Sequence, residues 1–179
     1  MRIRLLATLM LLGLLGETYA CKCNDSGTVE GSFNISDIVV SGRVLTKEIV
    51  PYSQTVNPDS VPAIKARFQG DKRRLKSFET TYLVKAEVEI VEKYKGVNLR
   101  DTVTIFTAVH SASCGYKFEV GRSYIIYASR RSYLGTIVMA EADTGKGLEL
   151  ENTYWTNICT RTAEYDYAEA AALRALMRE

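Results

Sequence analysis

The chain has 179 residues, of which 46% are hydrophobic and 25% are charged, and its formal net charge at pH 7 is +2. The length fits one domain with a sizeable core, and the near-balance of charge argues against nucleic acid as the main partner. A single histidine, His110, excludes a metal site built from several histidines.

The first 20 residues have the pattern of a secretory signal peptide. Two arginines precede an apolar run from Leu5 to Leu15, and Thr18-Tyr19-Ala20 matches the pattern of a cleavage site. An apolar core of about 11 residues is short for a membrane span. We therefore expect a signal peptide at 1–20 and one domain without a membrane span at 21–179. That domain would be secreted and extracellular or, in a bacterium, periplasmic.

Cleavage after Ala20 would leave 159 residues and a free α-amino group on Cys21. The amine and carbonyl of this residue are joined through Cα, so they can close a five-membered chelate ring around a metal ion. A metal ligand must be unprotonated, and an α-amine with a pKa of ~7.7–8.0 loses its proton near pH 7 at a cost of ~1 kcal/mol. Acylation of Cys21 in a lipid-anchored bacterial protein would block the amine, but Thr18 stands where a lipoprotein signal prefers leucine.

Strand patterns follow the N-terminal segment. A first strand is expected at Asp37 to Leu45. Residues Thr46 to Glu79 break the pattern, since they contain all three prolines and a basic run, and we expect an inserted loop at 46–79. Alternation then predicts a long strand from Thr80 to Tyr94. Its apolar face would consist of Tyr82, Val84, Ala86, Val88 and Ile90.

Shorter strands and a final helix complete the predicted fold. After a turn at Lys95 to Asn98, strands are expected at Thr102–Thr107, Ser123–Ser129 and Thr136–Ala140. The end of the chain, Thr162 to Glu179, is rich in alanine and lacks Gly and Pro, which predicts a helix. Its apolar positions would be Tyr165, Ala168, Ala172, Leu173 and Leu176. The expected fold is mainly β, a small OB-fold-like antiparallel barrel with a C-terminal α-helix.

Four cysteines remain after the leader: Cys21, Cys23, Cys114 and Cys159. An even number in an exported chain indicates disulfides. A Cys21–Cys23 bridge would close a strained small ring, so each of these two is expected to reach a distant partner, and both such pairings stay open. A zinc site of four thiolates lacks the usual C-x2-C spacing. A thiol–disulfide enzyme using Cys21-x-Cys23 would need an accessible thiol of low pKa.

The sequence offers little for conventional catalysis. A Ser-His-Asp or Cys-His arrangement would have to use His110, which stands in an expected loop near a cysteine expected to be oxidised. Neither a phosphate-binding loop nor a dinucleotide fingerprint is present. We therefore expect a protein that is not an enzyme and has no cofactor of its own.

Six short motifs follow one another along the chain. They are Cys21-x-Cys23, Asp37-Ile-Val-Val-x-Gly-x-Val, Tyr94-Lys95-Gly96, Ser113-Cys114-Gly115-Tyr116-x-Phe118, Gly121-x-x-Tyr124 and Thr156-Asn157-x-Cys159-x-Arg161-Thr162. In this order they resemble the inhibitory N-terminal domain of the tissue inhibitors of metalloproteinases (TIMPs), within the wider netrin-like (NTR) family. The resemblance covers nearly all of 21–179 except 46–79.

The resemblance implies an OB-like barrel with a packed helix, and the disulfides Cys21–Cys114 and Cys23–Cys159. It also implies a secreted inhibitor of zinc metalloproteinases. Cys21 would chelate the catalytic zinc of the bound protease and displace its water, so its only metal would be that zinc. Lys22 would enter the pocket for the substrate side chain that follows the scissile bond. The edge that contacts the protease would consist of Cys23, Ser113, Cys114, Gly115 and Tyr116.

Three features depart from the family pattern. Lys22 is a poor match for an apolar pocket, because burying an unpaired ammonium is costly. The third bridge of the family's inhibitory domain has no cysteines here, and the C-terminal domain of the vertebrate inhibitors has no counterpart.

The alternative function is a non-inhibitory netrin-like module that binds matrix, glycan or protein partners. Its candidate patch for heparin-like polyanions consists of Lys72, Arg73, Arg74 and Lys76. Asn24 and Asn34 also stand in glycosylation sequons.

Overall fold

Six strands form one curled sheet in the computed structural model, which describes residues 23, 27–131 and 150–178. The strands are β1 (Ile38–Pro51), β2 (Tyr82–Lys95), β3 (Thr102–Ala108), β4 (Ser123–Ala128), β5 (Thr153–Trp155) and β6 (Ala163–Glu164). Their order across the sheet is β5-β3-β2-β1-β4-β6. Neighbouring strands are antiparallel except β3 and β5, which are parallel.

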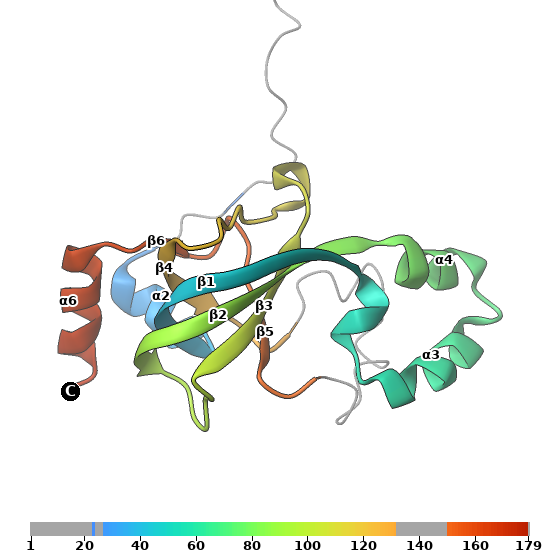
Figure 1. The fold of residues 1–179 in the computed structure, drawn as a ribbon, viewed down its shortest axis with the longest axis horizontal. Coiled ribbons are helices and arrows are strands. Elements are labelled where there is room, and N and C mark those ends of the chain that lie inside the picture. Colours follow the sequence, from blue (N-terminus) through green and yellow to red (C-terminus); the bar gives the residue numbers. More distant parts are fainter. Residues whose placement is uncertain (1–22, 24–26, 132–149, 179) are drawn as a thin grey trace, which may run out of the picture.

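The sheet bends far enough for its edge strand β5 to reach the end of β4. Ser129 and Trp155 exchange two backbone hydrogen bonds, with N···O distances of 2.9 and 2.7 Å. Three register shifts in the pairing of β1 with β2 favour this curvature, since bulges bend a strand and increase its twist. The result is a half-barrel with a C-terminal helix (Figure 1), which confirms the predicted mainly β, OB-fold-like class.

Alternating side chains of the strands fill the inside of the barrel. On β2, Ala86 and Val88 are fully buried, as the alternation predicted, but Tyr82 at the start of the strand is 56% exposed. Gly42 lets β1 approach β2 closely. A Cβ at Gly42 would lie 2.5 Å from Cγ1 of Val88 and 2.6 Å from the carbonyl oxygen of Glu89, so a larger residue would push the two strands apart.

Residues 46–79 do not form the loop that was predicted. β1 continues to Pro51, and it is followed by the 3₁₀ turns η1 (Tyr52–Thr55) and η2 (Pro58–Ser60) and the helices α3 (Val61–Phe68) and α4 (Lys72–Thr80). The prediction was wrong because Pro58 and Pro62 lie in the first turns of η2 and α3. Backbone N–H groups at these positions have no partner within the helix, so the N–H that proline lacks costs no hydrogen bond there. Figure 1 shows α3 and α4 at one end of the sheet.

These helices build a second core on that end of the sheet. Tyr52, Phe68 and Phe78 pack together with Phe106 and Trp155. Their ring centroids lie between 5.3 and 6.2 Å apart, the spacing of favourable aromatic pairs. The segment 46–79 is therefore part of the folded core.

The C-terminal helix α6 (Tyr167–Leu176) is shorter than the predicted 162–179. It begins where the side chain of Asp166 accepts a hydrogen bond from the backbone N–H of Glu169, at 2.8 Å, an N-cap contact. Its buried residues are Ala170 and Leu173, so the predicted apolar face is wrong at Ala168, which is exposed. An unpredicted helix, α2 (Val29–Ile35), packs in the same hydrophobic cluster as Ala170 and Leu173.

The predicted strand at Thr136–Ala140 lies outside the described residues. In the parts of the chain that the structure describes, no helix combines the length and the apolar character needed to span a membrane.

Candidate functional site

A disulfide joins the start of the described chain to the turn that follows β5. Cys23 and Cys159, 136 positions apart, are bonded, and their Cα atoms lie 5.0 Å apart. This is the pairing that the TIMP resemblance implied for these two cysteines. Cys23 is exposed and Cys159 is half-buried, so the bridge lies at the surface.

The turn after β3 carries the second part of the predicted site. The 3₁₀ turn η3 (Ser111–Ser113) ends at Cys114, which has a left-handed φ of 64°. Cys114 is also disulfide-bonded, and its partner lies outside the described residues. Ser113 is exposed, and its hydroxyl donates to the carbonyl of His110 at 2.9 Å. This hydrogen bond lies within the turn and stabilises it.

These two turns are neighbours in space. The backbone N–H of Ile158 donates to the carbonyl oxygen of Cys114 at 3.0 Å, so the turn that carries Cys159 lies against the turn that carries Cys114. Cys23, bonded to Cys159, is held at the same edge of the barrel. The structure thus brings together two segments that are 45 residues apart in the sequence.

Gly115 and Tyr116 connect this edge to the core. The N–H of Gly115 donates to the carbonyl of His110 at 2.9 Å, and the N–H of Tyr116 donates to the hydroxyl of Thr107 at 2.8 Å. The ring of Tyr116 packs 4.8 Å from that of Phe118, centroid to centroid. Burial raises the pKa of Tyr116 to about 12. Tyr116 was predicted as a contact residue, and its ring faces the inside of the barrel.

Threonine hydroxyls and one asparagine shape the turn that carries Cys159. The hydroxyl oxygen of Thr156 lies 2.7 Å from those of Thr160 and Thr162. The side-chain oxygen of Asn157 accepts from the N–H of Cys159 at 2.7 Å and from the N–H of Thr160 at 3.1 Å, which is an Asx-type turn. Sequence reasoning assigned these residues no role, although they lie within the motif Thr156 to Thr162.

Arg161 links four parts of the molecule. Its Nε and Nη2 donate to the two carboxylate oxygens of Glu169 on α6, at 2.8 and 3.1 Å. Its Nη1 donates to the carbonyl of Gly27 at 3.1 Å. Glu169 also accepts from the hydroxyl of Tyr127 on β4 at 2.7 Å. The hydrogen bonds with Glu169 raise the pKa of Arg161, against the opposing effect of burial.

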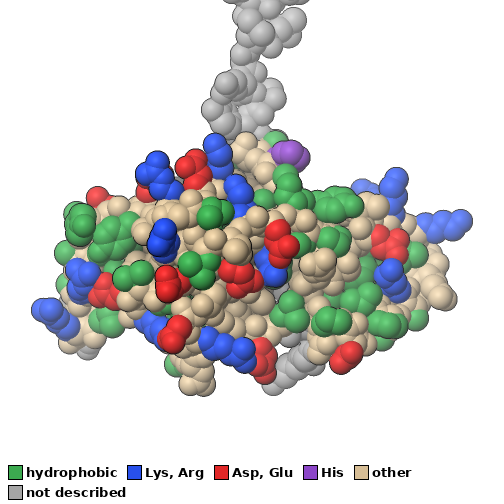
Figure 2. Space-filling view, in the orientation of Figure 1, with side chains coloured by type: hydrophobic (Ala, Val, Ile, Leu, Met, Phe, Trp, Pro, Cys, Tyr) green, Lys and Arg blue, Asp and Glu red, His purple; other side chains and the backbone are tan. Residues whose placement is uncertain are grey.

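The candidate polyanion patch is on α4. Lys72, Arg73, Arg74 and Lys76 are all exposed, and Figure 2 shows basic side chains at the end of the molecule that α3 and α4 form. Asp71 caps the helix by accepting from the N–H groups of Arg73 and Arg74. It also lies 3.4 Å from Nε of Arg74, so the patch contains an internal acidic partner.

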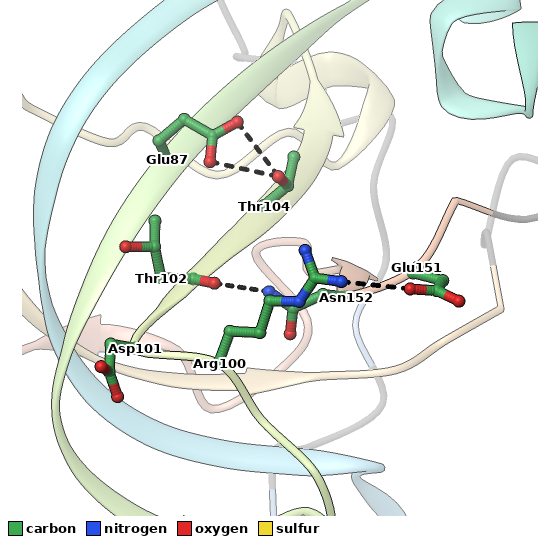
Figure 3. Close-up of a pocket in the computed structure, with 7 residues that line it drawn as sticks. All are labelled: Glu87, Arg100, Asp101, Thr102, Thr104, Glu151 and Asn152. Atoms are coloured by element: carbon green, nitrogen blue, oxygen red, sulfur yellow. Dashed lines mark hydrogen bonds and ion pairs between the residues drawn. The ribbon is translucent and has the colours of Figure 1, made fainter.

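An open polar cleft of about 420 Å³ lies on another part of the sheet (Figure 3). It is lined by Glu87, Arg100, Asp101, Thr102, Thr104, Glu151 and Asn152, none of which was predicted as a site residue. Arg100 and Glu151 form an ion pair at 3.2 Å, and Glu87 accepts from the hydroxyl of Thr104. Within the described ranges, no three His, Cys, Asp or Glu residues are grouped as a metal site would require.

Cys21, Lys22 and Asn24 lie outside the described residues, so the predicted zinc ligand and pocket residue stay predictions. Asn34 is exposed at the end of α2.

A scan of the chain against protein-family models and a search of curated proteins each find no match.

Proposed function

We propose that the chain is a secreted inhibitor of zinc metalloendopeptidases, and that the α-amine and carbonyl of Cys21 chelate the catalytic zinc of the bound protease. The observation that carries this proposal is the edge where the Cys23–Cys159 disulfide and the Cys114 turn meet. Cys23 is two residues after the proposed ligand, and it is covalently held at this edge.

Such anchoring would lower the ordering cost of binding, because a ligand that is fixed before association loses less conformational freedom. In the proposed pairing, Cys21 is itself bonded to Cys114. The backbone N–H of Cys114 donates to the carbonyl of Ser111 within its own turn, and its carbonyl accepts from Ile158 in the turn after β5. A catalytic zinc keeps one position open for a further ligand, and an α-amine with an ordinary pKa of ~7.7–8.0 loses its proton near pH 7 at a much lower cost than a lysine amine at ~10.4.

Lys22 sets a condition on the target. In the proposed complex its side chain enters the pocket beside the zinc, where an unpaired ammonium would be costly to bury. We infer that a susceptible protease has an acidic or deep, wet pocket at this position.

The decisive experiment changes the N-terminus of the mature protein. Mass spectrometry of secreted material should show Cys21 as the first residue, with an unmodified amine. The protein should then be assayed against a panel of zinc metalloendopeptidases. One alanine added before Cys21 should abolish inhibition, because it converts the free amine into an amide that cannot bind zinc.

The control is the same extended protein after an aminopeptidase has removed the added alanine, which should inhibit again. Circular dichroism and thermal unfolding should be the same for both forms. Inhibition that survives the added residue would show that zinc chelation by Cys21 is not the mechanism.

A second candidate function is the non-inhibitory netrin-like module. The observation that favours it is the exposure of all four basic residues on α4, Lys72, Arg73, Arg74 and Lys76. These side chains lie at the α3 and α4 end of the molecule, where a heparin-like polyanion could approach them without disturbing the disulfide edge.

A further inference from the structure

The N-terminal segment is anchored twice to the same short stretch of chain. Cys23 is bonded covalently to Cys159, and Gly27 accepts a hydrogen bond from Arg161. The two anchors are four residues apart on one side and two residues apart on the other. Cys23 and Gly27 are therefore both fixed to the turn that follows β5.

The guanidinium of Arg161 is itself held in place. The side chains of Arg161 and Glu169 are only 28% and 15% exposed, and they make the bidentate pair that a planar guanidinium favours. Glu169 is fixed in turn by the hydroxyl of Tyr127, a residue with no exposed surface. The third N–H group of Arg161 therefore points at Gly27 from a preorganised position.

Gly27 also lies directly before the start of α2. The next residue, Thr28, is the N-cap of this helix, and its hydroxyl accepts from the N–H of Gly31 at 3.0 Å. The carbonyl of Thr28 accepts from the N–H of Ser32, also at 3.0 Å. A fixed Gly27 therefore fixes the point at which the N-terminal segment leaves α2.

We propose that Arg161 is a positioning residue for inhibition. It acts as the second anchor that holds the N-terminal segment ready for the protease, while the Cys23–Cys159 disulfide is the first. Arg161 does not touch the zinc in this proposal, and the effect on inhibition rests on the proposed function. Loss of the anchor would lower the fraction of molecules that are ready to bind, which weakens apparent affinity in proportion.

The test compares Arg161→Gln with Arg174→Gln in the mature protein. Arg174 is a matched control because it also makes a bidentate pair, with Glu92 at 2.8 and 2.7 Å, and it also ties α6 to the sheet. Hydrogen exchange of the Gly31 and Ser32 amides should become about tenfold faster in Arg161→Gln, and it should stay unchanged in Arg174→Gln.

Inhibition provides the second readout. Against a metalloendopeptidase that the unmodified protein inhibits, Arg161→Gln should associate about tenfold more slowly, and Arg174→Gln should be unaffected. Arg161→Lys, which keeps one charged donor, should recover part of the loss. This variant also keeps the test informative if Arg161→Gln does not fold.

The outcomes separate the two proposals. Unchanged amide exchange in folded Arg161→Gln, or an equal change in both variants, would overturn the anchoring role. Faster exchange confined to the Arg161 variants, in a protein that inhibits no protease, would support the anchor and reject the proposed function. Faster exchange with unchanged association would overturn the positioning role in inhibition.

Discussion

Gly115 shows how tightly the turn after β3 is packed. A Cβ at this position would collide with the carbonyl oxygen of Ala108, and it would lie 2.7 Å from the carbonyl carbon of Ala108 and 2.9 Å from the carbonyl oxygen of His110. All of these atoms belong to the backbone, which cannot rotate away as a flexible side chain can. Only glycine therefore fits between β3 and the disulfide-bonded Cys114.

We predict that Gly115→Ala lowers the free energy of unfolding by about 3 kcal/mol, a loss typical of severe overpacking. Urea unfolding of the mature protein, followed by circular dichroism, measures the change. Gly70→Ala is the matched control, because a Cβ at Gly70 would meet no atom within 4 Å, and its effect should stay within about 0.5 kcal/mol. Similar stabilities for the two variants would contradict the tight packing at Gly115.

Single residues also show what the sequence could not predict. The resemblance places Ser113, Cys114, Gly115 and Tyr116 together on one contact edge, but the structure divides them. Ser113 is exposed, Gly115 is buried, and the ring of Tyr116 lies against Phe118 and Tyr124. Spacing predicts that such residues are close together, but the direction of each side chain depends on the turn geometry at Cys114, where φ is positive.

Helix α4 presents its charges outward because its apolar side is occupied. Phe78 is fully buried and Leu75 packs beside it, so the basic residues lie on the side away from the second core. If this surface binds polyanions, the contact will be electrostatic and will weaken with salt.

We predict that the double variant Arg73→Gln, Lys76→Gln elutes from a heparin column at a lower salt concentration than the unmodified protein. The control is Arg100→Gln, Lys117→Gln, which removes the same charge from exposed positions elsewhere. Equal elution of the two double variants would reject a polyanion site on α4, and no retention of the unmodified protein would reject the binding-module function in this form.

Elements with a long periodic pattern were predicted well, and very short ones were missed. The strand at Thr80–Tyr94 differs from β2 by only two residues at its start and one at its end. β5 and β6 have three and two residues, too few to show alternation. Prolines and charges dominate the composition of 46–79 and predict a loop, whereas its helices depend on a few buried aromatic residues, Tyr52, Phe68 and Phe78.

Buried tyrosines connect the stability of the whole molecule to pH. Burial raises the pKa of Tyr94 and of Tyr116 to about 12, and it also raises the pKa of Tyr124, Tyr127 and Tyr154. A phenol whose pKa is higher in the folded state binds its proton more tightly there. Its contribution to stability is complete below pH ~10 and is lost as the pH rises towards 12.

We predict that the free energy of unfolding falls steeply above pH ~10. Tyr116→Phe removes one of the groups responsible, so its stability relative to the unmodified protein should rise by up to about 1.4 kcal/mol per pH unit between pH 10 and 12. Urea unfolding at a series of pH values measures this difference. A difference that does not vary with pH would contradict the raised pKa of Tyr116.

The overall class was predictable because strand alternation and a final alanine-rich segment are properties of whole elements. The site was predicted less completely. The sequence indicated which cysteines matter, but the roles of Arg161, Glu169 and the threonine cluster depend on contacts between β4, α6 and the turn after β5. Contacts of this kind leave no periodic signal in a single sequence.

Strand β5 has a consequence for how the chain must be made. Its three residues pair with β3, and Trp155 bridges to Ser129 just after β4, so β5 covers backbone groups at both places that would otherwise be unpaired. Because β3 and β4 both precede β5 in the chain, a growing polypeptide carries these uncovered backbone groups until Thr153 to Trp155 have emerged. Premature termination before Thr153 would therefore yield fragments with uncovered strand edges. Such fragments would be prone to edge-to-edge association and would not form a smaller folded barrel.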